Sequence, residues 1–264
     1  MKKLLVAGVL IAAAASGPTF AADLLADMMV PHKAPPPAYG LTPVYSWTGC
    51  YLGIEGGGDW GQSSHIAATS PVPAAVGLPI TNSFDVSGGL LGGTAGCNYQ
   101  FQNIVFSLEN DLSWTNNTGS GREIPPFIAG AISSTNEKWL DTVRGRVGLA
   151  WNRFFFYGTG GAAFADVGVG VCTPVGCVSD SQDRTGWVAG GGVEWAAWTS
   201  PLSSVTLKLE YLHADFGTGL FFSPPVLIGG GIIDSRNVSL TNNIIRGGIN
   251  WKFDWFKISS LNTY

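Results

Sequence analysis

A hairpin in the middle of the chain constrains the fold more than any other stretch. Two predicted strands lie between Asp141 and Phe164 (DTVRGRVGLAWNRFFFYGTGGAAF) and meet at the turn Asn152-Arg153. In the first strand one face carries Val143, Val147, Leu149 and Trp151, and the opposite face carries Arg144 and Arg146. This period of two is typical of a strand with one apolar and one polar environment. The hairpin alone leaves open which face points into the fold.

The composition favours a protein that lies in a membrane. Only 12% of the residues are charged, which is about half the usual share in soluble proteins. No apolar run reaches the length of about 18 residues that a membrane-spanning helix needs. High apolarity without such a helix indicates a transmembrane β-barrel.

The N-terminus predicts export. Lys2 and Lys3 precede an apolar run over 4–15, and Thr19-Phe20-Ala21 has the small residues of a cleavage site. Residues 1–21 are therefore predicted to be a cleaved secretory signal peptide. The further predicted domains are a Pro-rich periplasmic lead-in over 22–46, a β-barrel over 47–253 and a C-terminal tail over 254–264. Acidic residues outnumber basic ones by 18 to 14, so no nucleic-acid binding is expected.

Alternation and glycine content predict eight strands, and their connections alternate in length. The strands are predicted at about residues 47–61, 84–101, 104–114, 137–151, 154–171, 185–198, 204–216 and 241–253. The connections run long, short, long, short, long, short, long, with a loop over 172–184 as the third long one. This order is typical of an all-β, eight-stranded antiparallel up-and-down transmembrane β-barrel with long extracellular loops and short periplasmic turns.

The tryptophans provide an independent indication, because they fall near strand ends. Those predicted at the outer ends are Trp60, Trp114, Trp139 and Trp187. Those predicted at or just beyond the periplasmic ends are Trp47, Trp151, Trp195, Trp198, Trp251 and Trp255. Two aromatic belts at the membrane interfaces would have this distribution. The apolar strand faces are then predicted to meet lipid.

The charged strand faces are consequently predicted to line the lumen. They carry Glu55, Asp59, Glu109, Asp111, Arg144, Arg146, Glu194, Lys208, Glu210, Arg246 and Lys252. Eight strands enclose a space that side chains just fill, so these residues are predicted to form a paired network that plugs the barrel. The alternative is a narrow pore for ions or protons.

The four cysteines are candidates for disulfides in an exported protein. Cys172 and Cys177 are predicted to close a short loop. Cys50 and Cys97 lie near the periplasmic ends of neighbouring strands and face outward, so both a cross-strand disulfide and two free thiols remain open. The spacings do not match a zinc site, and no metal is expected.

Histidines are scarce and suggest two further hypotheses. His65 in the first outer loop and His213 near an outer strand end could approach each other and ligate a haem iron. They are otherwise ordinary polar residues of the rim. His213 with Asp215 and a loop serine is the only candidate for a hydrolase site, and no motif surrounds it. Neither enzyme activity nor a cofactor is therefore expected.

Several stretches resemble the outer-membrane immunogenic proteins of alphaproteobacteria, which are small barrels of the OmpA, OmpX and opacity type. These stretches are KAPPP, YSWTGCYLG, the hairpin 141–164, TGWVAGGGVEWA and LKLEYLHADFG. The resemblance implies an abundant surface antigen that stabilises the envelope. Some relatives are described as haem binders or porins, but no fixed ligand residues carry over. One departure is the tail 254–264 after Phe253, the expected terminal aromatic of the barrel.

We therefore expect an outer-membrane surface protein with a structural role and a plugged lumen. The alternatives are a narrow porin for small solutes and a haem-binding protein. Expected partners are outer-membrane lipids, lipopolysaccharide and the barrel-assembly machinery, with host or envelope contacts through the outer loops. The protein is expected to be a monomer.

Overall fold

The computed structural model describes residues 45–200, 202–228 and 231–253. The predicted signal peptide 1–21, most of the lead-in 22–46 and the tail 254–264 lie outside the described residues. The chain divides into two units, 1–42 and 43–264, and only the second contains described residues.

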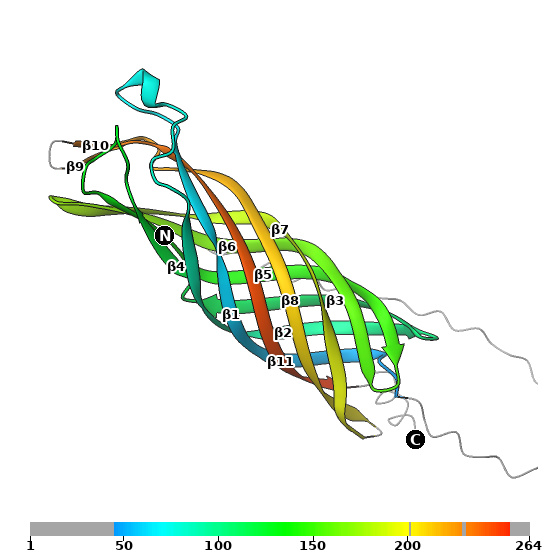
Figure 1. The fold of residues 1–264 in the computed structure, drawn as a ribbon. Coiled ribbons are helices and arrows are strands. Elements are labelled where there is room, and N and C mark those ends of the chain that lie inside the picture. Colours follow the sequence, from blue (N-terminus) through cyan, green and yellow to red (C-terminus); the bar gives the residue numbers. More distant parts are fainter. Residues whose placement is uncertain (1–44, 201, 229–230, 254–264) are drawn as a thin grey trace, which may run out of the picture. The chain divides into compact units, whose positions relative to one another are not determined.

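Eight long antiparallel strands form a closed ring, which confirms the predicted fold class (Figure 1). They are β1 (Gly49–Ala67), β2 (Phe84–Phe101), β3 (Ile104–Thr115), β5 (Ile132–Trp151), β6 (Phe154–Thr173), β7 (Gly176–Thr199), β8 (Ser203–Phe221) and β11 (Arg236–Phe253). Each strand pairs with its neighbour in the chain, and β1 closes the ring by pairing with β11. Ring closure gives each of these long strands a paired neighbour on both sides, as a lipid environment requires, although β7 pairs with β8 only from Trp187 onward.

Four short elements belong to the connections between long strands. They are the 3-10 turn η1 (Pro73–Ala75) and strands β4 (Thr118–Arg122), β9 (Val226–Ile228) and β10 (Gly231–Ile233). β4 pairs with β5 and, at one position, with β2, so it continues the place of β3 in the ring. Across the described ranges, no helix is long and apolar enough to cross a membrane.

The two ends of the ring differ in their connections. At one end, here named the turn end, the strands join through Gln102-Asn103, Asn152-Arg153 and the segment 200–202. Gln102 and Asn152 both have a φ of 55°, a left-handed conformation that asparagine tolerates better than most residues. The opposite end, here named the loop end, carries the connections that contain η1, β4, β9 and β10.

The prediction of a long loop over 172–184 is wrong. β6 continues to Thr173 and β7 begins at Gly176, so Pro174-Val175 is a tight turn. The period-two pattern explains this extension, because Val167, Val169 and Val171 continue one buried face along β6. Three other strands also extend further toward the loop end than predicted. β1 continues to Ala67, β8 continues to Phe221, and β11 begins at Arg236.

The outward faces between the ends are apolar and exposed. Leu52, Leu91 and Val143 are 59%, 67% and 51% exposed. Seven tryptophans are also exposed on this surface: Trp60, Trp114, Trp151, Trp187, Trp195, Trp198 and Trp251. Trp139 is half-buried, and Trp255 lies outside the described residues. Trp47 is fully buried, so its assignment to an aromatic belt is wrong.

The interior changes character along the barrel. Charged side chains fill its middle. The loop end contains the upper apolar cluster, whose buried members include Val167, Val169, Val171, Val188, Leu212, Ala214, Phe216, Phe221, Phe222, Ile233, Val238 and Leu240. A smaller group at the turn end contains Trp47, Val105, Phe155, Tyr157 and Ala196. The described interior is therefore packed at three successive levels.

Candidate functional site

Nine charged side chains converge in the middle of the barrel and form what we name the lumen network. They are Glu55, Glu109, Asp111, Arg144, Arg146, Glu194, Lys208, Glu210 and Arg246. They come from β1, β3, β5, β7, β8 and β11, and each occupies an inward position of its strand. None of them is more than 3% exposed.

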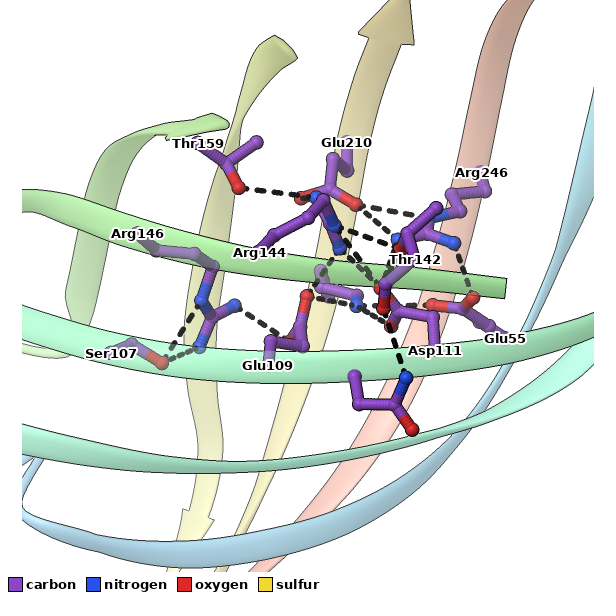
Figure 2. Close-up of polar contacts among 12 residues, drawn as sticks. Glu55, Ser107, Glu109, Asp111, Thr142, Arg144, Arg146, Thr159, Glu210 and Arg246 are labelled. Atoms are coloured by element: carbon purple, nitrogen blue, oxygen red, sulfur yellow. Dashed lines mark hydrogen bonds and ion pairs between the residues drawn. The ribbon is translucent and has the colours of Figure 1, made fainter. Parts of the chain in front are cut away.

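Arg144 lies at the centre of the lumen network (Figure 2). Its Nη2 is 2.6 Å from Glu109 Oε1 and 2.5 Å from Asp111 Oδ2, and its Nη1 is 2.8 Å from Glu210 Oε1. The Nη1 group also donates a hydrogen bond to Thr159 Oγ1 at 3.3 Å. The donors of the planar guanidinium group thus bind three carboxylates from two strands.

Arg246 and Lys208 extend these contacts to other strands. Arg246 Nη2 is 2.9 Å from Asp111 Oδ2 and 2.7 Å from Glu210 Oε2, and Nη1 contacts Glu55 Oε1. Lys208 Nζ lies 3.1 Å from Glu55 Oε2 and 3.2 Å from a carboxylate oxygen of Glu109. Asp111 and Glu210 therefore each bind two guanidinium groups, which offsets the cost of burying two like charges together.

Arg146 occupies the turn-end side of the lumen network. Its Nη1 is 3.0 Å from Glu109 Oε2 and 3.4 Å from Glu194 Oε2. Its guanidinium carbon lies 4.7 Å from the ring centre of Tyr157 and 5.4 Å from that of Tyr51. Aromatic faces attract a desolvated cation, so these rings stabilise the buried charge together with the carboxylates.

Two tyrosine hydroxyls complete the carboxylate contacts, and neither tyrosine was among the predicted lumen residues. Tyr51 Oη donates to Glu109 Oε2 at 2.5 Å, and Tyr157 Oη donates to Glu210 Oε1 at 3.1 Å. Both tyrosines alternate with apolar outward residues on their strands, and this alternation indicates that their side chains point inward. Buried carboxylates need several donors, and these hydroxyls supply them without adding charge.

Two of the eleven predicted lumen residues lie away from the lumen network. Asp59 accepts hydrogen bonds from the side-chain amides of Asn117 at 2.9 Å and Asn242 at 3.0 Å. It lies nearer the loop end than Glu55 on the same strand. Lys252 lies at the turn end, where its Nζ donates to the backbone carbonyls of Ser46 and Thr48.

Residues 45–48 form an N-terminal plug at the turn end. The Trp47 ring lies 5.3 Å from the ring of Phe155, and the backbone N–H of Trp47 donates to Gln100 Oε1 at 2.7 Å. The hydroxyls of Tyr45 and Ser204 are 2.8 Å apart. These contacts hold Trp47 inside the barrel, which is the physical reason why it does not join an interfacial belt.

Four further buried charged residues toward the loop end were not predicted: Glu123, Glu137, Asp234 and Arg236. Glu137 accepts a hydrogen bond from the Asn242 amide at 2.8 Å, and Glu123 pairs with Arg236 at 3.1 Å. A β-bulge between Glu137 and Leu140 exchanges the two faces of β5. Counting positions back from Arg144 therefore places Glu137 on the wrong face, whereas Arg236 was assigned to a loop.

The two histidines lie on opposite faces of the barrel wall, so the prediction that they approach each other is wrong. His65 is fully buried, and its Nε2 is 2.9 Å from Thr135 Oγ1. His213 occupies an outward position on β8, where its Nδ1 is 3.0 Å from Asn243 Oδ1 and its ring is 5.5 Å from that of Trp187. A shared haem iron would require both side chains on the same side.

The remaining questions from the sequence concern a hydrolase site at Asp215, a metal site and the disulfides. Asp215 accepts from the backbone N–H of Gly217 at 2.8 Å, within β8 where the pairing with β11 shifts register. Within the described ranges, no group of three or more His, Cys, Asp or Glu side chains could hold a metal ion. The structure contains two disulfides, Cys50–Cys97 between β1 and β2 and Cys172–Cys177 across the β6–β7 turn. For Cys50 and Cys97 the structure thus favours the cross-strand disulfide over two free thiols.

Comparison with known proteins shows that this ring of strands is similar to outer-membrane proteins. Residues 74–253 match the outer membrane protein beta-barrel domain. A 31 kDa outer-membrane immunogenic protein of Brucella melitensis is 31% identical, over 87% of this chain and 93% of the relative. A 22 kDa outer membrane protein of Rhizobium leguminosarum is 30% identical over 67% of each chain. The crystal structure of Neisserial surface protein A is 12% identical, covers 78% of this chain and 98% of that chain, and has a TM-score of 0.37.

Proposed function

This chain belongs to the outer membrane protein beta-barrel domain family, and from that membership we propose that it is a structural, surface-exposed protein of the cell envelope. Its place in the outer membrane follows from the family. Our proposal adds that the barrel is closed to solutes, and that its function depends on the stability of the wall and on the surface at the loop end.

The single observation that carries closure is the burial of the lumen network. Its ion-paired side chains are at most 2% exposed, although they come from six strands around the ring. The lining of a water-filled pore would be solvated and accessible. Eight-stranded barrels have interiors of a size that side chains fill, which agrees with this packing.

Two further levels support closure. At the turn end, the N-terminal plug places the buried ring of Trp47 against Phe155. At the loop end, the upper apolar cluster fills the interior with Leu212, Phe216 and their neighbours. A solute would have to displace all three levels, and the middle one contains buried ion pairs that are costly to separate.

The loop end is the proposed contact surface. The Brucella and Rhizobium relatives are outer-membrane proteins, and those of Brucella carry the description immunogenic. By this likeness, we assign to the loop end of this chain a role as surface antigen. The exposed apolar wall would contact outer-membrane lipid and lipopolysaccharide, and the barrel-assembly machinery would insert it.

Conductance tests the closed barrel directly. The refolded protein is added to planar lipid bilayers, with a known porin as a positive control. We expect no stepwise conductance from the wild-type protein or from Trp47→Ala, since the latter opens only the turn end. Steady channels in the wild-type protein would favour the narrow porin. Channels in Trp47→Ala alone would assign closure to the N-terminal plug.

The envelope role has a separate test. Deletion of the gene is expected to increase the sensitivity of cells to detergents and bile salts, and expression of the wild-type chain should restore resistance. A deletion strain with unchanged sensitivity would contradict the structural role, whatever the bilayer measurements show.

A further inference from the structure

A cavity at the loop end is separate from the closed interior. Its volume is about 350 Å³, and three connections line it. Segment 70–75 follows β1, segment 123–128 follows β4, and segment 232–236 leads from β10 into β11. Three connections that are distant in sequence therefore build one pocket, of a size that holds a small organic molecule.

The charges in the pocket wall do not balance. Glu123, Asp234 and Arg236 all line it, and they are 8%, 8% and 2% exposed. Arg236 Nη1 is 3.1 Å from Glu123 Oε1 and donates to Ser133 Oγ at 2.7 Å. Its guanidinium also lies 5.4 Å from the ring centre of Phe222. Glu123 and Arg236 thus neutralise each other, which leaves the carboxylate of Asp234 as the surplus charge.

The Asp234 carboxyl accepts a side-chain hydrogen bond from Ser70, but one of its two oxygens has no donor. Its Oδ1 is buried, and no group in the described ranges donates a hydrogen bond to it. Burial raises the pKa of this carboxyl, and the nearby Arg236 and the hydrogen bond from Ser70 offset that effect only in part. A buried carboxylate oxygen without a partner is costly, and a ligand that brings a positively charged donor removes that cost.

The remaining lining is apolar. Val72, Phe127, Ile128 and Ile232 surround the charged groups, and Val72 is 53% exposed at the surface. A bare metal ion would leave these side chains unused. A hydrocarbon group of modest size would bury apolar surface against them, at about 25 cal/mol for each Å² removed from water.

We propose that this pocket binds a small organic cation, with its ammonium group on Asp234 and its apolar group against Val72, Phe127 and Ile232. The site is a surface function in addition to closure of the barrel, and it does not depend on whether the lumen conducts. An anionic ligand is the main competitor, because Arg236 Nε also lacks a partner among the described residues.

Phenethylamine is a suitable probe, since it joins a primary ammonium to an apolar ring. Binding to the full-length refolded protein in lipid nanodiscs is measured by titration calorimetry at neutral pH. Two analogues of similar size, 2-phenylethanol and 3-phenylpropanoate, replace the cation by a neutral and an anionic group. We expect saturable binding of the amine and at least about tenfold weaker binding of both analogues, as for loss of one charge-assisted hydrogen bond.

Matched variants assign the effect to the pocket. Asp234→Asn should weaken amine binding about tenfold or more, while Asp183→Asn on the exposed face of β7 should leave it unchanged. Val72→Arg tests the same site by placing a competing cation in the pocket wall at an exposed position, and it should also weaken amine binding. Each variant is shown to be folded if its unheated sample keeps the gel mobility of the folded wild-type barrel. Equal binding of the amine to wild type and Asp234→Asn, preference for 3-phenylpropanoate, or no saturable binding of the amine would each overturn the proposal.

Discussion

The middle and the loop end of this barrel have opposite interiors on the same strands. On β8, the inward residues Lys208 and Glu210 belong to the lumen network, whereas Leu212, Ala214 and Phe216 belong to the upper apolar cluster. The exteriors are reversed accordingly. Around the network the wall exposes Leu209 and Leu207, while the loop-end part of β7 exposes Ser179, Ser181 and Asp183.

This contrast indicates where the membrane ends. A wall in lipid gains from apolar outward side chains, and its polar inward side chains must then satisfy one another. A wall in water gains from the reverse arrangement, because burial of apolar side chains drives folding there. The barrel is thus a membrane protein in its middle and resembles a water-soluble barrel at its loop end. The change occurs within single strands.

The largest expected effect comes from breaking the lumen network. Arg144→Met keeps most of the side-chain volume but leaves Glu109, Asp111 and Glu210 short of a partner. We expect the free energy of unfolding to fall by about 3 to 5 kcal/mol, as for removal of one partner from a buried ion pair. Urea unfolding of the refolded barrel, followed by tryptophan fluorescence, measures it.

The control for this prediction is Arg153→Met in the exposed Asn152-Arg153 turn, which should cost less than about 0.5 kcal/mol. The double variant Arg144→Met with Glu109→Gln should lose less than the sum of the two single variants, because the two side chains interact directly. Additive losses would contradict a coupled network.

An intermediate effect is expected in the upper apolar cluster. Leu212 is fully buried on the inward face of β8, whereas Leu209 on the outward face is 57% exposed. Leu212→Ala should destabilise the barrel by about 2 to 4 kcal/mol, because it removes packed methyl groups and leaves a cavity. Leu209→Ala should cost clearly less, since lipid replaces the missing contacts. Equal losses in the same unfolding assay would contradict a packed interior at the loop end.

The smallest expected effect separates the two exteriors. Leu209→Lys places a charge on the lipid-facing wall and should cost about 2 kcal/mol near the membrane centre. Ser181→Lys on the loop-end part of β7 should change stability by no more than about 0.5 kcal/mol. The difference between the two stability losses locates the boundary between the lipid-facing and the water-facing parts of the wall. A large loss for Ser181→Lys would place that part of the wall in lipid as well.

The sequence predicted the fold class because its evidence is local. Alternation along the hairpin 141–164 and the short turns at Gln102-Asn103 and Asn152-Arg153 identify antiparallel neighbours. The prediction of a loop over 172–184 was wrong because Cys172, Pro174 and Gly176 suggest a turn region. They do not show that the strands on both sides pair up to that turn.

The interior was less predictable than the wall. Parity along a strand separates inward from outward residues, but a bulge such as that between Glu137 and Leu140 reverses it without a clear signal in sequence. Parity also carries no information on height. Asp59 and Glu55 share a face of β1, yet Glu55 contacts Lys208 and Arg246, and Asp59 contacts amides. The aromatic character of Trp47 suggested a membrane interface equally well as the burial that the N-terminal plug provides.

The sequence by itself determined that the strands have one apolar and one polar face, that they are antiparallel, and that the apolar face meets lipid. These properties follow from the period of two and from the lengths of the turns, which involve residues close together in the chain. The tertiary structure alone decided which charges meet, where the interior becomes apolar, and how 45–48 and the three loop-end connections fold over the ends. Those contacts join residues up to 206 positions apart, as for Lys252 and Ser46, so they depend on the register in which the whole ring closes.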